Sequence, residues 1–499
     1  MNTRVRYAPS PTGLQHIGGI RTALFNWLYA RSSGGKFVLR LEDTDRTRYD
    51  PTFEQNLYET FKWLGIYWDE GPDIGGQCAP YVQSERTEMY RKHTQELLES
   101  GNAYRCFCSQ ERLEKIREER EKEKSQETGY DRHCRSIDKD ESEKRALDGE
   151  SFTIRLKIPL ETNAVTGFTD KLLGNIEWKN SDINPDPVLL KSDGFPTYHL
   201  ANVIDDHFMG ITHILRAQEW LSSVPLHVIL YKAFGWEPPV FCHLPMVMGQ
   251  DGKKLSKRHG AASIDQFRRE GYLAEALINY TALLGCSYEE GKDIYTPNEL
   301  AKLFSLDKLN KAPAVFDYKK LEWYNGQYIR MKNNKELSAL SLPWAIEQDL
   351  FGNGGNPPAA EETELYTAAM DLVRERANYL PEIPAKLKFL FSEPEIPAIE
   401  EFIPKKSDLP STCSLLSLGK TLIPAFFPNG KYISDEEAEQ IVKETAEKES
   451  VKLGDLLMPL RVAITGSRVS PPLFASIRLL GKETCLSRID RALSALSSV

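Results

Sequence analysis

The stretch Ala8–Gly19 constrains the fold of this chain more than any other part of it. It follows a short apolar segment and leads into Ile20–Ala30, where apolar residues recur at helical spacing, so the expected order is strand, loop and helix. A helix that opens at His16 offers free backbone N–H groups and the positive end of its dipole, which suit a phosphate. Gly18 and Gly19 have no Cβ, so a flat ligand or a triphosphate can approach the backbone closely.

A second stretch, Gly249–Gly260, is a strongly basic loop with glycines at both ends. Lys254, Lys257 and Arg258 supply cations that can close over phosphates, and the glycines supply hinges. Taken singly, a His-x-Gly-Gly turn is most often only a helix start, and a basic loop is most often a solvated surface. Together and in this order, the two stretches resemble the two signature sequences of class I aminoacyl-tRNA synthetases.

Length and charge narrow the class of protein further. A chain of 499 residues is too long for one core, and roughly three or four domains are expected. No apolar run is long enough for a membrane span and no apolar signal region opens the chain, so the cytoplasm is the expected location. The net charge of −9 argues against indiscriminate nucleic-acid binding but leaves local basic faces for tRNA. Eight cysteines in such a chain favour reduced thiols or a metal site.

Apolar runs predict the strands of the nucleotide-binding sheet. Phe37–Leu41 is expected to be a buried strand, and the sheet is expected to resume at Pro187–Lys191 and Pro196–Asp206, with a strand end at His213–Arg216. In an open parallel sheet, ligands bind beyond the carboxyl ends of the strands. Glu42 is therefore placed to meet an amino group; a capping acid before the next helix is the alternative.

Composition changes at Gly101 and again near Lys320. The block Tyr104–Ser181 contains a charge-rich helical pattern and an alternating strand at Phe152–Ile158, which predicts an α+β domain inserted between two halves of the nucleotide fold. From about Lys320 onward, helical patterns are broken by prolines and no nucleotide-type motif occurs, which predicts a helical tail.

At this point the chain resembles bacterial-type glutamyl-tRNA synthetase over essentially its whole length. The motifs that carry the resemblance are Ala8–Gly19, Arg40–Asp45, Pro196–Asp206, Lys254–Arg258 and Pro459–Glu483. The resemblance implies an α/β fold: a Rossmann-like nucleotide-binding catalytic domain with an inserted α+β domain, a stem-contact region and all-α anticodon-binding domains. The implied boundaries are 1–100 and 184–220 for the two catalytic halves, 101–183 for the insert, 221–330 for the stem-contact domain with the basic loop, and 331–403 and 404–499 for two helical subdomains.

The implied activity is that of a glutamate–tRNA ligase. ATP, accompanied by Mg²⁺, and L-glutamate give glutamyl-adenylate and pyrophosphate, and the glutamyl group then moves to the 3′-terminal adenosine of tRNA-Glu; charging of tRNA-Gln as well stays open. A monomer is expected. The helical tail argues against glutaminyl-tRNA synthetase, whose anticodon module is a β-barrel. A small-molecule nucleotidyltransferase and a non-catalytic tRNA-binding relic are the rival readings.

The resemblance also assigns site residues. Catalytic roles fall to His16, Gly18, Gly19, Lys254 and Lys257, and ATP contacts to the same residues with Pro9, Ser10, Thr12, Gly13, Leu244 and Ser256. Glutamate contacts fall to Arg6, Ala8, Ser10, Glu42, Tyr198, Asn202 and Arg216, and the segment His243–Met246 is expected to border the adenine. Physical chemistry supports two arginines, because a substrate with two carboxylates is best held by two planar guanidinium forks. Arg216 is the residue expected to reject glutamine.

Cys106-x-Cys108, with further donors about 25 residues later, has the character of a zinc site. Relatives in the family complete such a site with Cys-x-His or with Tyr-x-x-x-Cys, and Tyr130 and Cys134 fit the second pattern. We therefore expect a structural Zn²⁺ held by Cys106, Cys108, Tyr130 and Cys134. His133 is the alternative fourth ligand, and three free cysteines in a metal-free insert are the other reading.

The two ends of a bound tRNA are assigned to different parts of the chain. By resemblance, the insert is expected to meet the acceptor end and the helical C-terminal half the anticodon, where arginine and aromatic side chains read splayed bases. Arg376 is the candidate anticodon reader by its position in the family, and a charge on a helix surface is the alternative.

Overall fold

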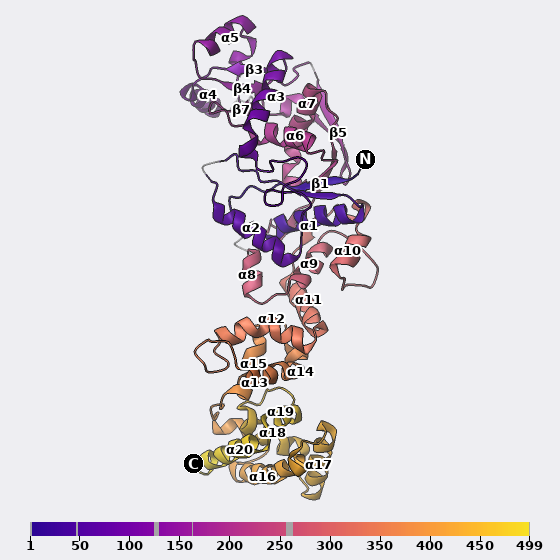
Figure 1. Ribbon diagram of the computed structural model, residues 1–499, viewed down its shortest axis with the longest axis vertical. Coiled ribbons are helices and arrows are strands. Elements are labelled where there is room, and N and C mark those ends of the chain that lie inside the picture. The colour runs from indigo at the N-terminus through magenta and orange to yellow at the C-terminus, as the bar shows by residue number, and fades with distance from the viewer. Residues whose placement is uncertain (1, 46–47, 124–128, 162, 256–262, 499) are drawn as a thin grey trace. The chain divides into compact units, whose positions relative to one another are not determined.

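The computed structural model describes residues 2–45, 48–123, 129–161, 163–255 and 263–498. The chain forms two compact units (Figure 1). Unit 1 comprises Met1–Arg268 and Ala274–Tyr318, and unit 2 comprises Arg269–Leu273 and Lys319–Val499. Each unit is described by itself.

Parallel strands form the centre of unit 1. Strand β1 (Arg4–Tyr7) pairs in parallel with β2 (Lys36–Leu39), and the connecting helix α1 (Ile17–Ser32) is buried on several sides. Strands β8 (His213–Ala217) and β9 (Val240–Leu244) are also parallel and are joined through α7 (Val224–Phe234). The amide of Thr212 donates to the carbonyl of Arg4 at 2.9 Å, so β1 and β8 run side by side.

The structure corrects the predicted course of the sheet after residue 183. Strand β7 (Val188–Leu190) pairs with β4 (Thr153–Leu156) in the antiparallel sheet β3-β4-β7, and Tyr198–Phe208 forms helix α6. The expectation that the nucleotide-binding sheet resumes at Pro187–Lys191 and Pro196–Asp206 was therefore wrong. A three-residue apolar run fits any sheet, whereas the apolar residues Leu200, Ala201, Val203 and Ile204 of α6 recur at helical spacing, which should have favoured a helix.

The hairpin of β5 (Val165–Asp170) and β6 (Gly174–Lys179) also lies elsewhere than expected. It was assigned to the insert, but β5 pairs with β9, and the four strands follow the order β6-β5-β9-β8. The hairpin thus extends the nucleotide-binding sheet, and the last residue of β5 is brought next to β9. This placement matters for the site described below.

The remaining elements of unit 1 surround these sheets. They are α2 (Pro51–Leu64), α3 (Thr87–Glu99), β3 (Ala103–Cys106), α4 (Gln110–Lys122), α5 (Lys139–Leu147), β10 (Val247–Met248), α8 (Ile264–Arg269), α9 (Ala274–Leu283), α10 (Pro297–Leu303) and β11 (Ala314–Val315). Helices α4 and α5 expose almost all of their surface, consistent with their high content of charged residues. The short strand β10, which directly precedes the basic loop in the sequence, pairs in parallel with β11.

Every regular element of unit 2 that the structure describes is helical. The helices are α11 (Tyr318–Met331), α12 (Asn334–Glu347), α13 (Ala360–Ala368), α14 (Met370–Val373), α15 (Glu382–Phe391), α16 (Leu409–Leu422), α17 (Asp435–Lys448), α18 (Leu453–Thr465), α19 (Leu473–Leu480) and α20 (Lys482–Ser497). Helices α16, α18 and α20 pack around Leu416, Leu460 and Ile489, which are fully buried. The predicted fold class is confirmed: an α/β part with parallel strands is followed by an all-α part. The predicted domain boundaries stay a prediction.

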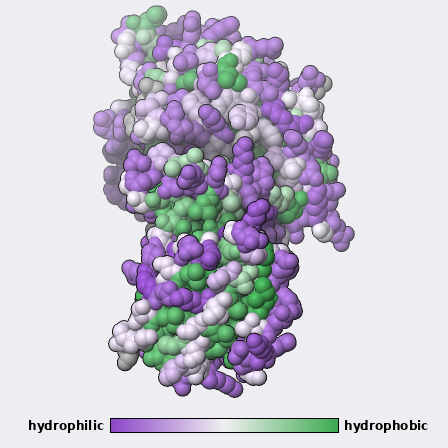
Figure 2. Space-filling view, turned by 60° about the horizontal axis from the view of Figure 1, so that its bottom comes forward, coloured by the Kyte–Doolittle hydropathy of each residue, from purple (hydrophilic) through white to green (hydrophobic). Residues whose placement is uncertain are grey.

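The surface gives no sign of a membrane-crossing helix in the described part of the chain. None of its helices is long and apolar enough to span a bilayer. In the face drawn in Figure 2, hydrophilic residues occupy much of the surface and hydrophobic ones form patches between them.

Candidate active site

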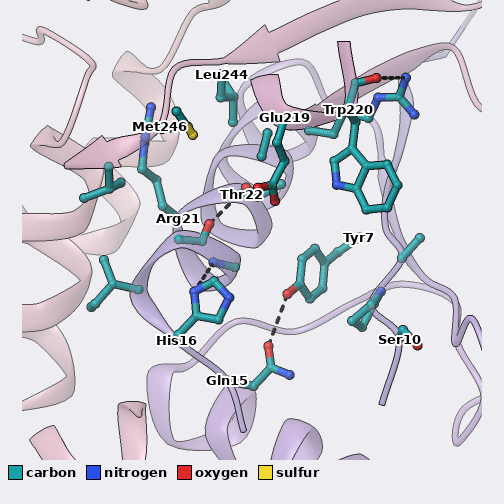
Figure 3. A pocket seen from close by; sticks show the side chains of 18 of the residues that line it. Tyr7, Ser10, Gln15, His16, Arg21, Thr22, Glu219, Trp220, Leu244 and Met246 are labelled. Atoms are coloured by element: carbon teal, nitrogen blue, oxygen red, sulfur yellow. Dashed lines mark hydrogen bonds between the residues drawn. The ribbon is translucent and has the colours of Figure 1, made fainter. Parts of the chain in front are cut away.

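A cavity of about 540 Å³ lies beyond the carboxyl ends of the parallel strands. Its walls are the loop and helix start that follow β1, the segments that follow β8 and β9, and the first turns of α6. Figure 3 shows side chains from these segments converging on it. The predicted residues that line it are Arg6, Ala8, Pro9, Ser10, Thr12, Gly13, His16, Gly18, Gly19, Glu42, Tyr198, Asn202, Arg216, Leu244 and Lys254. Ser256 and Lys257 lie outside the described residues.

His16 is the N-cap of α1, and its geometry fixes its protonation. The ring Nδ1 accepts the backbone N–H of Gly19 at 3.3 Å. Partial desolvation by the surrounding protein and the nearby charge of Lys254 lower the pKa of His16, which favours the neutral imidazole. Because Nδ1 accepts a hydrogen bond, the neutral ring carries its proton on Nε2. There is no room for a side chain at Gly19, because a Cβ there would lie 2.8 Å from the hydroxyl of Tyr7. His16 therefore offers a neutral N–H donor at the positive end of a helix.

Lys254 forms an ion pair with Glu219, which follows β8. Both side chains are largely exposed and both line the cavity. The ion pair holds the ammonium of Lys254 near His16, since the charges of both partners act on the histidine. Glu219 was not predicted from the sequence.

Arg6 and Arg40 meet on one buried carboxylate, that of Asp206. Arg6 donates through Nε at 3.0 Å and Nη2 at 3.2 Å, and Arg40 donates through Nη1 at 2.7 Å. Burial raises the pKa of Asp206, but the two guanidinium groups outweigh this effect and the pKa lies below its ordinary value. Removal of one member of this cluster would be destabilising, because it would leave an uncompensated buried charge.

This cluster makes the two predicted arginines unequal. Asp206 already neutralises Arg6 and takes its Nε–H and one Nη2–H, which leaves the two N–H groups of Nη1 and the second of Nη2 for a ligand. Glu42 lies beside it and accepts from Arg40 Nη2 at 3.0 Å and from Asn202 Nδ2 at 3.3 Å. Burial raises the pKa of Glu42, although Arg40 and Arg6 oppose the shift. Glu42 is the carboxylate that a ligand's amino group would meet in the cavity.

Arg216 differs from Arg6 because all its hydrogen-bond partners are neutral. Its Nε donates to His243 Nε2 at 3.0 Å, Nη1 to the hydroxyl of Tyr198 at 2.8 Å and Nη2 to the carbonyl of Trp220 at 3.2 Å. Among the described residues no carboxylate lies within ion-pair distance of it, yet it is only 5% exposed. A buried guanidinium without a counter-ion favours an anionic ligand.

Three of the four residues that were expected to border an adenine line the cavity. Leu244, Pro245 and Met246 line the cavity, but His243 is fully buried with its ring against Arg216 and is not part of the lining. Asp206 and Arg40 lie inside motifs that carried the resemblance, but neither of them was predicted as a site residue. A pair of aspartates at the end of an otherwise apolar helix was the signal that could have identified Asp206.

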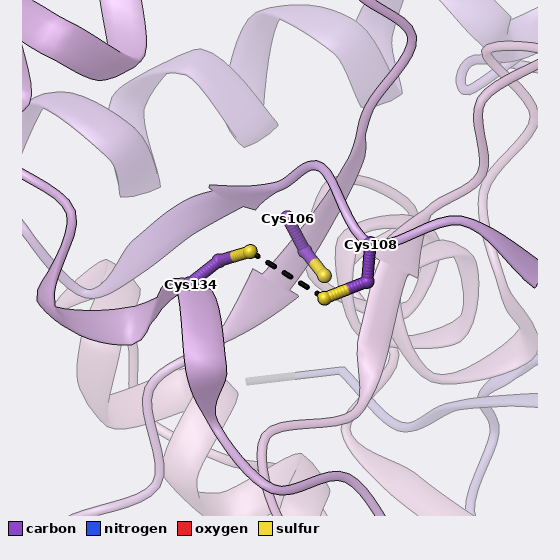
Figure 4. Close-up of side chains that lie close together, drawn as sticks. All are labelled: Cys106, Cys108 and Cys134. Atoms are coloured by element: carbon purple, nitrogen blue, oxygen red, sulfur yellow. Dashed lines mark hydrogen bonds between the residues drawn. The ribbon is translucent and has the colours of Figure 1, made fainter. Parts of the chain in front are cut away.

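Three cysteines of the insert come together as predicted (Figure 4). The Sγ atoms of Cys106, Cys108 and Cys134 all lie within 4.8 Å of one another, and the Sγ atoms of Cys108 and Cys134 are 3.6 Å apart. The hydroxyl of Tyr130 lies 3.3 Å from Cys106 Sγ and accepts the backbone N–H of Cys134 at 2.9 Å. Hydrogen bonds from Cys134 and then Tyr130 lower the pKa of Cys106 to about 4, against the effect of burial. His133 is exposed and does not belong to the cluster.

Arg376 lies in unit 2, between α14 and α15. Its Nη1 donates to the carbonyl of Ser470 at 2.6 Å, and the side chain is exposed. The contact ties the loop before α19 to this segment. A role in reading an anticodon stays a prediction.

Two protein-family models match this chain. The model for "tRNA synthetases class I (E and Q), catalytic domain" matches residues 2–323, and that for an anticodon binding domain matches residues 336–493. The parallel strands, the His16 helix start and the cavity beyond them are thus those of a class I aminoacyl-tRNA synthetase. The chain is 54% identical to the glutamate–tRNA ligase of Treponema denticola, over 99% of each chain, and 50% identical to that of Borreliella burgdorferi, over 99% of this chain and 98% of the relative. It belongs to the glutamate–tRNA ligase family.

A solved structure agrees with this assignment. A glutamate tRNA ligase from Elizabethkingia meningosepticum, crystallised in complex with its amino acid, superposes with a TM-score of 0.89 at 35% sequence identity. The match covers 99% of this chain and all of that one. A second, from Elizabethkingia anophelis, gives a TM-score of 0.85 at 34% identity.

Proposed function

We propose that the protein is an ATP-dependent ligase that joins L-glutamate to tRNA. In the first step a carboxylate oxygen of glutamate attacks the α-phosphorus of ATP, and pyrophosphate leaves. In the second, a ribose hydroxyl of the 3′-terminal adenosine of tRNA attacks the carbonyl carbon of glutamyl-adenylate, and AMP leaves. The observation that carries the proposal is Arg216, a buried cation with neutral partners in a cavity that also offers Glu42 to an amino group. The glutamate–tRNA ligase relatives support it.

The phosphates of ATP lie against the N-terminus of α1. The segment Pro9–Gly13, Gly18 and Gly19 give them a close backbone approach, His16 donates from Nε2, and Lys254 exchanges Glu219 for a phosphate oxygen. Ser256 and Lys257, from the same basic loop, complete this set. Leu244 packs against the adenine. Mg²⁺ bound with ATP supplies further positive charge on the phosphates.

Glutamate lies across the floor of the cavity. Its side-chain carboxylate meets Arg216 and Tyr198, and its ammonium meets Glu42. Ala8, Ser10 and Asn202 complete the pocket, with Arg6 contributing the N–H groups that Asp206 leaves free. Glutamine is rejected because a neutral amide would leave the buried guanidinium of Arg216 without a counter-charge.

Aminoacylation with labelled glutamate and separately purified tRNA-Glu and tRNA-Gln tests the proposal. We expect charging of tRNA-Glu that depends on ATP and on glutamate. Charging of tRNA-Gln in addition would define a non-discriminating enzyme, whose product an amidotransferase must convert. Folded protein that charges neither tRNA would contradict the function. The tRNA choice, the cytoplasmic location and the monomeric state remain predictions.

The cysteine cluster is proposed to hold a structural Zn²⁺ through Cys106, Cys108, Cys134 and Tyr130. Three thiols and a hydroxyl within one small volume supply four donors, and tetrahedral sites of this size are typical of zinc. Burial raises the pKa of Tyr130, so the cation must lower it for the phenolate to bind.

The two ends of tRNA are proposed to bind different parts of the chain. The insert would bind the acceptor end, and Arg376 in the helical part would bind the anticodon.

We expect about one zinc per chain in protein purified without chelator, because a closed four-donor site binds the ion tightly. Metal analysis of Cys106→Ala should show the loss of zinc and a lower melting temperature. Cys413→Ala is the matched control, since Cys413 is a free cysteine in α16 outside the cluster. Absence of zinc from the unchanged protein, or a full complement of zinc in Cys106→Ala, would contradict the assignment. Tyr130→Phe asks whether the phenol is the fourth ligand.

A further inference from the structure

Behind Arg216 lies a chain of two buried polar side chains that its role as a carboxylate ligand does not use. His243 receives the Nε–H of Arg216 on Nε2 at 3.0 Å, and its Nδ1 is 2.7 Å from Asp170 Oδ2. Both residues are almost completely inaccessible, with exposed fractions of 0% and 1%. They come from different elements: His243 from β9, and Asp170 from the end of β5 in the hairpin that extends the sheet.

The hydrogen bonds determine which nitrogen of His243 carries the proton. Asp170 is ionised, and a carboxylate can only accept, so Nδ1 must be the protonated nitrogen. Burial raises the pKa of Asp170, but the hydrogen bond from His243 and those from the backbone outweigh this effect, and the pKa lies below its ordinary value. Nε2 is then an acceptor, and it faces the Nε–H of Arg216. Every donor along the chain meets an acceptor.

The consequence for Arg216 is a fixed orientation. A guanidinium has five N–H groups, and His243, Tyr198 and Trp220 take one each, from Nε, Nη1 and Nη2. One N–H group on Nη1 and one on Nη2 remain. Two N–H groups on the two terminal nitrogens can bind a carboxylate through two hydrogen bonds.

We propose that Asp170 and His243 are positioning residues that hold the guanidinium of Arg216 end-on toward the side-chain carboxylate of the amino-acid substrate, so that the β5–β6 hairpin takes part in amino-acid selection. The inference rests on the proposed function. Neither residue touches the substrate; both act through Arg216. Asp170 is anchored for this purpose, because its Oδ1 accepts the backbone N–H groups of Leu172 and Leu173, each at 2.9 Å, and its Oδ2 also accepts that of His243 at 3.0 Å.

Asp170→Asn changes one atom and tests the chain sharply. An asparagine would turn its NH₂ toward His243, because that orientation opposes one backbone donor, the N–H of His243, whereas the opposite orientation would oppose two, those of Leu172 and Leu173. His243 would then protonate on Nε2 and confront Arg216 with a donor. We expect a rise of about tenfold to a hundredfold in the KM for glutamate in tRNA-dependent ATP–pyrophosphate exchange, with the KM for ATP unchanged.

Two substitutions of His243 separate hydrogen bonding from packing. His243→Phe keeps a ring but removes the acceptor, and should match Asp170→Asn. His243→Gln keeps an oxygen near the place of Nε2, and should restore much of the affinity for glutamate. The double variant D170N/H243F should be no worse than either single variant, because both remove the same link. Thr166→Val is the matched control: Thr166 is buried on β5 and bonds Asn180, away from Arg216.

A spectroscopic readout is independent of activity. The ¹⁵N resonances of the His243 ring, assigned by their loss in His243→Gln, should show the Nδ1–H tautomer in the unchanged protein and the Nε2–H tautomer in Asp170→Asn. An unchanged KM for glutamate in Asp170→Asn and His243→Phe would overturn the proposal, as would an equal rise in the KM for ATP or a His243→Gln variant as weak as His243→Phe. If Asp170→Asn does not fold, the two His243 variants and the tautomer of the unchanged protein decide the matter. Lack of glutamate-dependent exchange in the unchanged protein would instead contradict the proposed function.

Discussion

Replacing Arg216 by alanine is expected to lower kcat/KM for glutamate by a factor of about 30 to several thousand, since truncating one partner of a buried charge pair costs about 2–5 kcal/mol. The reason lies in the partners of Arg216: the hydroxyl of Tyr198, the ring of His243 and the carbonyl of Trp220 are all neutral. The substrate carboxylate is then the charge that compensates it. Without the guanidinium, that carboxylate would be desolvated in the cavity with no cation to meet it.

Arg216→Lys is the informative companion variant. Lysine keeps the positive charge but presents a point charge in place of a planar fork, so we expect an intermediate loss. The preference for glutamate over glutamine should fall in both variants, and the KM for ATP should stay near that of the unchanged protein. The measurement is steady-state exchange with either amino acid, alongside a melting curve to verify folding. Unaltered discrimination in Arg216→Ala would show that the selectivity lies elsewhere.

The contrast between Arg216 and Arg6 explains how far the sequence could predict this site. Both arginines were expected to hold a carboxylate, because the resemblance assigned both to the amino-acid substrate and that substrate has two carboxylates. The structure brings both to the cavity, but Asp206, 200 positions away along the chain, already neutralises Arg6. Which of two buried cations has a counter-ion depends on long-range packing, and no local pattern encodes it.

The same limit applies to the fold. The strand–loop–helix at the start of the chain was predicted correctly because its turn residues and its helical spacing are local. The partner of β7 was predicted wrongly because a short apolar strand carries no information about its neighbour. The misplacement of the β5–β6 hairpin also hid Asp170, whose contact with His243 exists only because β5 pairs with β9. The resemblance predicted residues that line the cavity, and the topology of the sheet decides which residues lie behind them.

Replacing His16 by alanine is expected to reduce kcat for glutamate activation by about 10²- to 10³-fold, the usual effect of removing one donor from developing charge. The neutral ring donates from Nε2 because Nδ1 is occupied by the N–H of Gly19. In the proposed function, that donor acts on the α-phosphate oxygens, where negative charge develops during attack by the glutamate carboxylate. The KM for glutamate should change little, since the lost interaction strengthens only in the transition state.

The dual position of His16 requires a variant that separates catalysis from capping. His16→Ala also removes the N-cap of α1, which costs about 1 kcal/mol of stability. Asparagine is a good N-cap and can accept the N–H of Gly19, but it has no group at the place of Nε2. His16→Asn should therefore melt near the unchanged protein and still lose activity as His16→Ala does. If His16→Asn instead keeps kcat within about threefold, His16 acts only as a cap and the phosphates depend on the helix terminus and Lys254 alone.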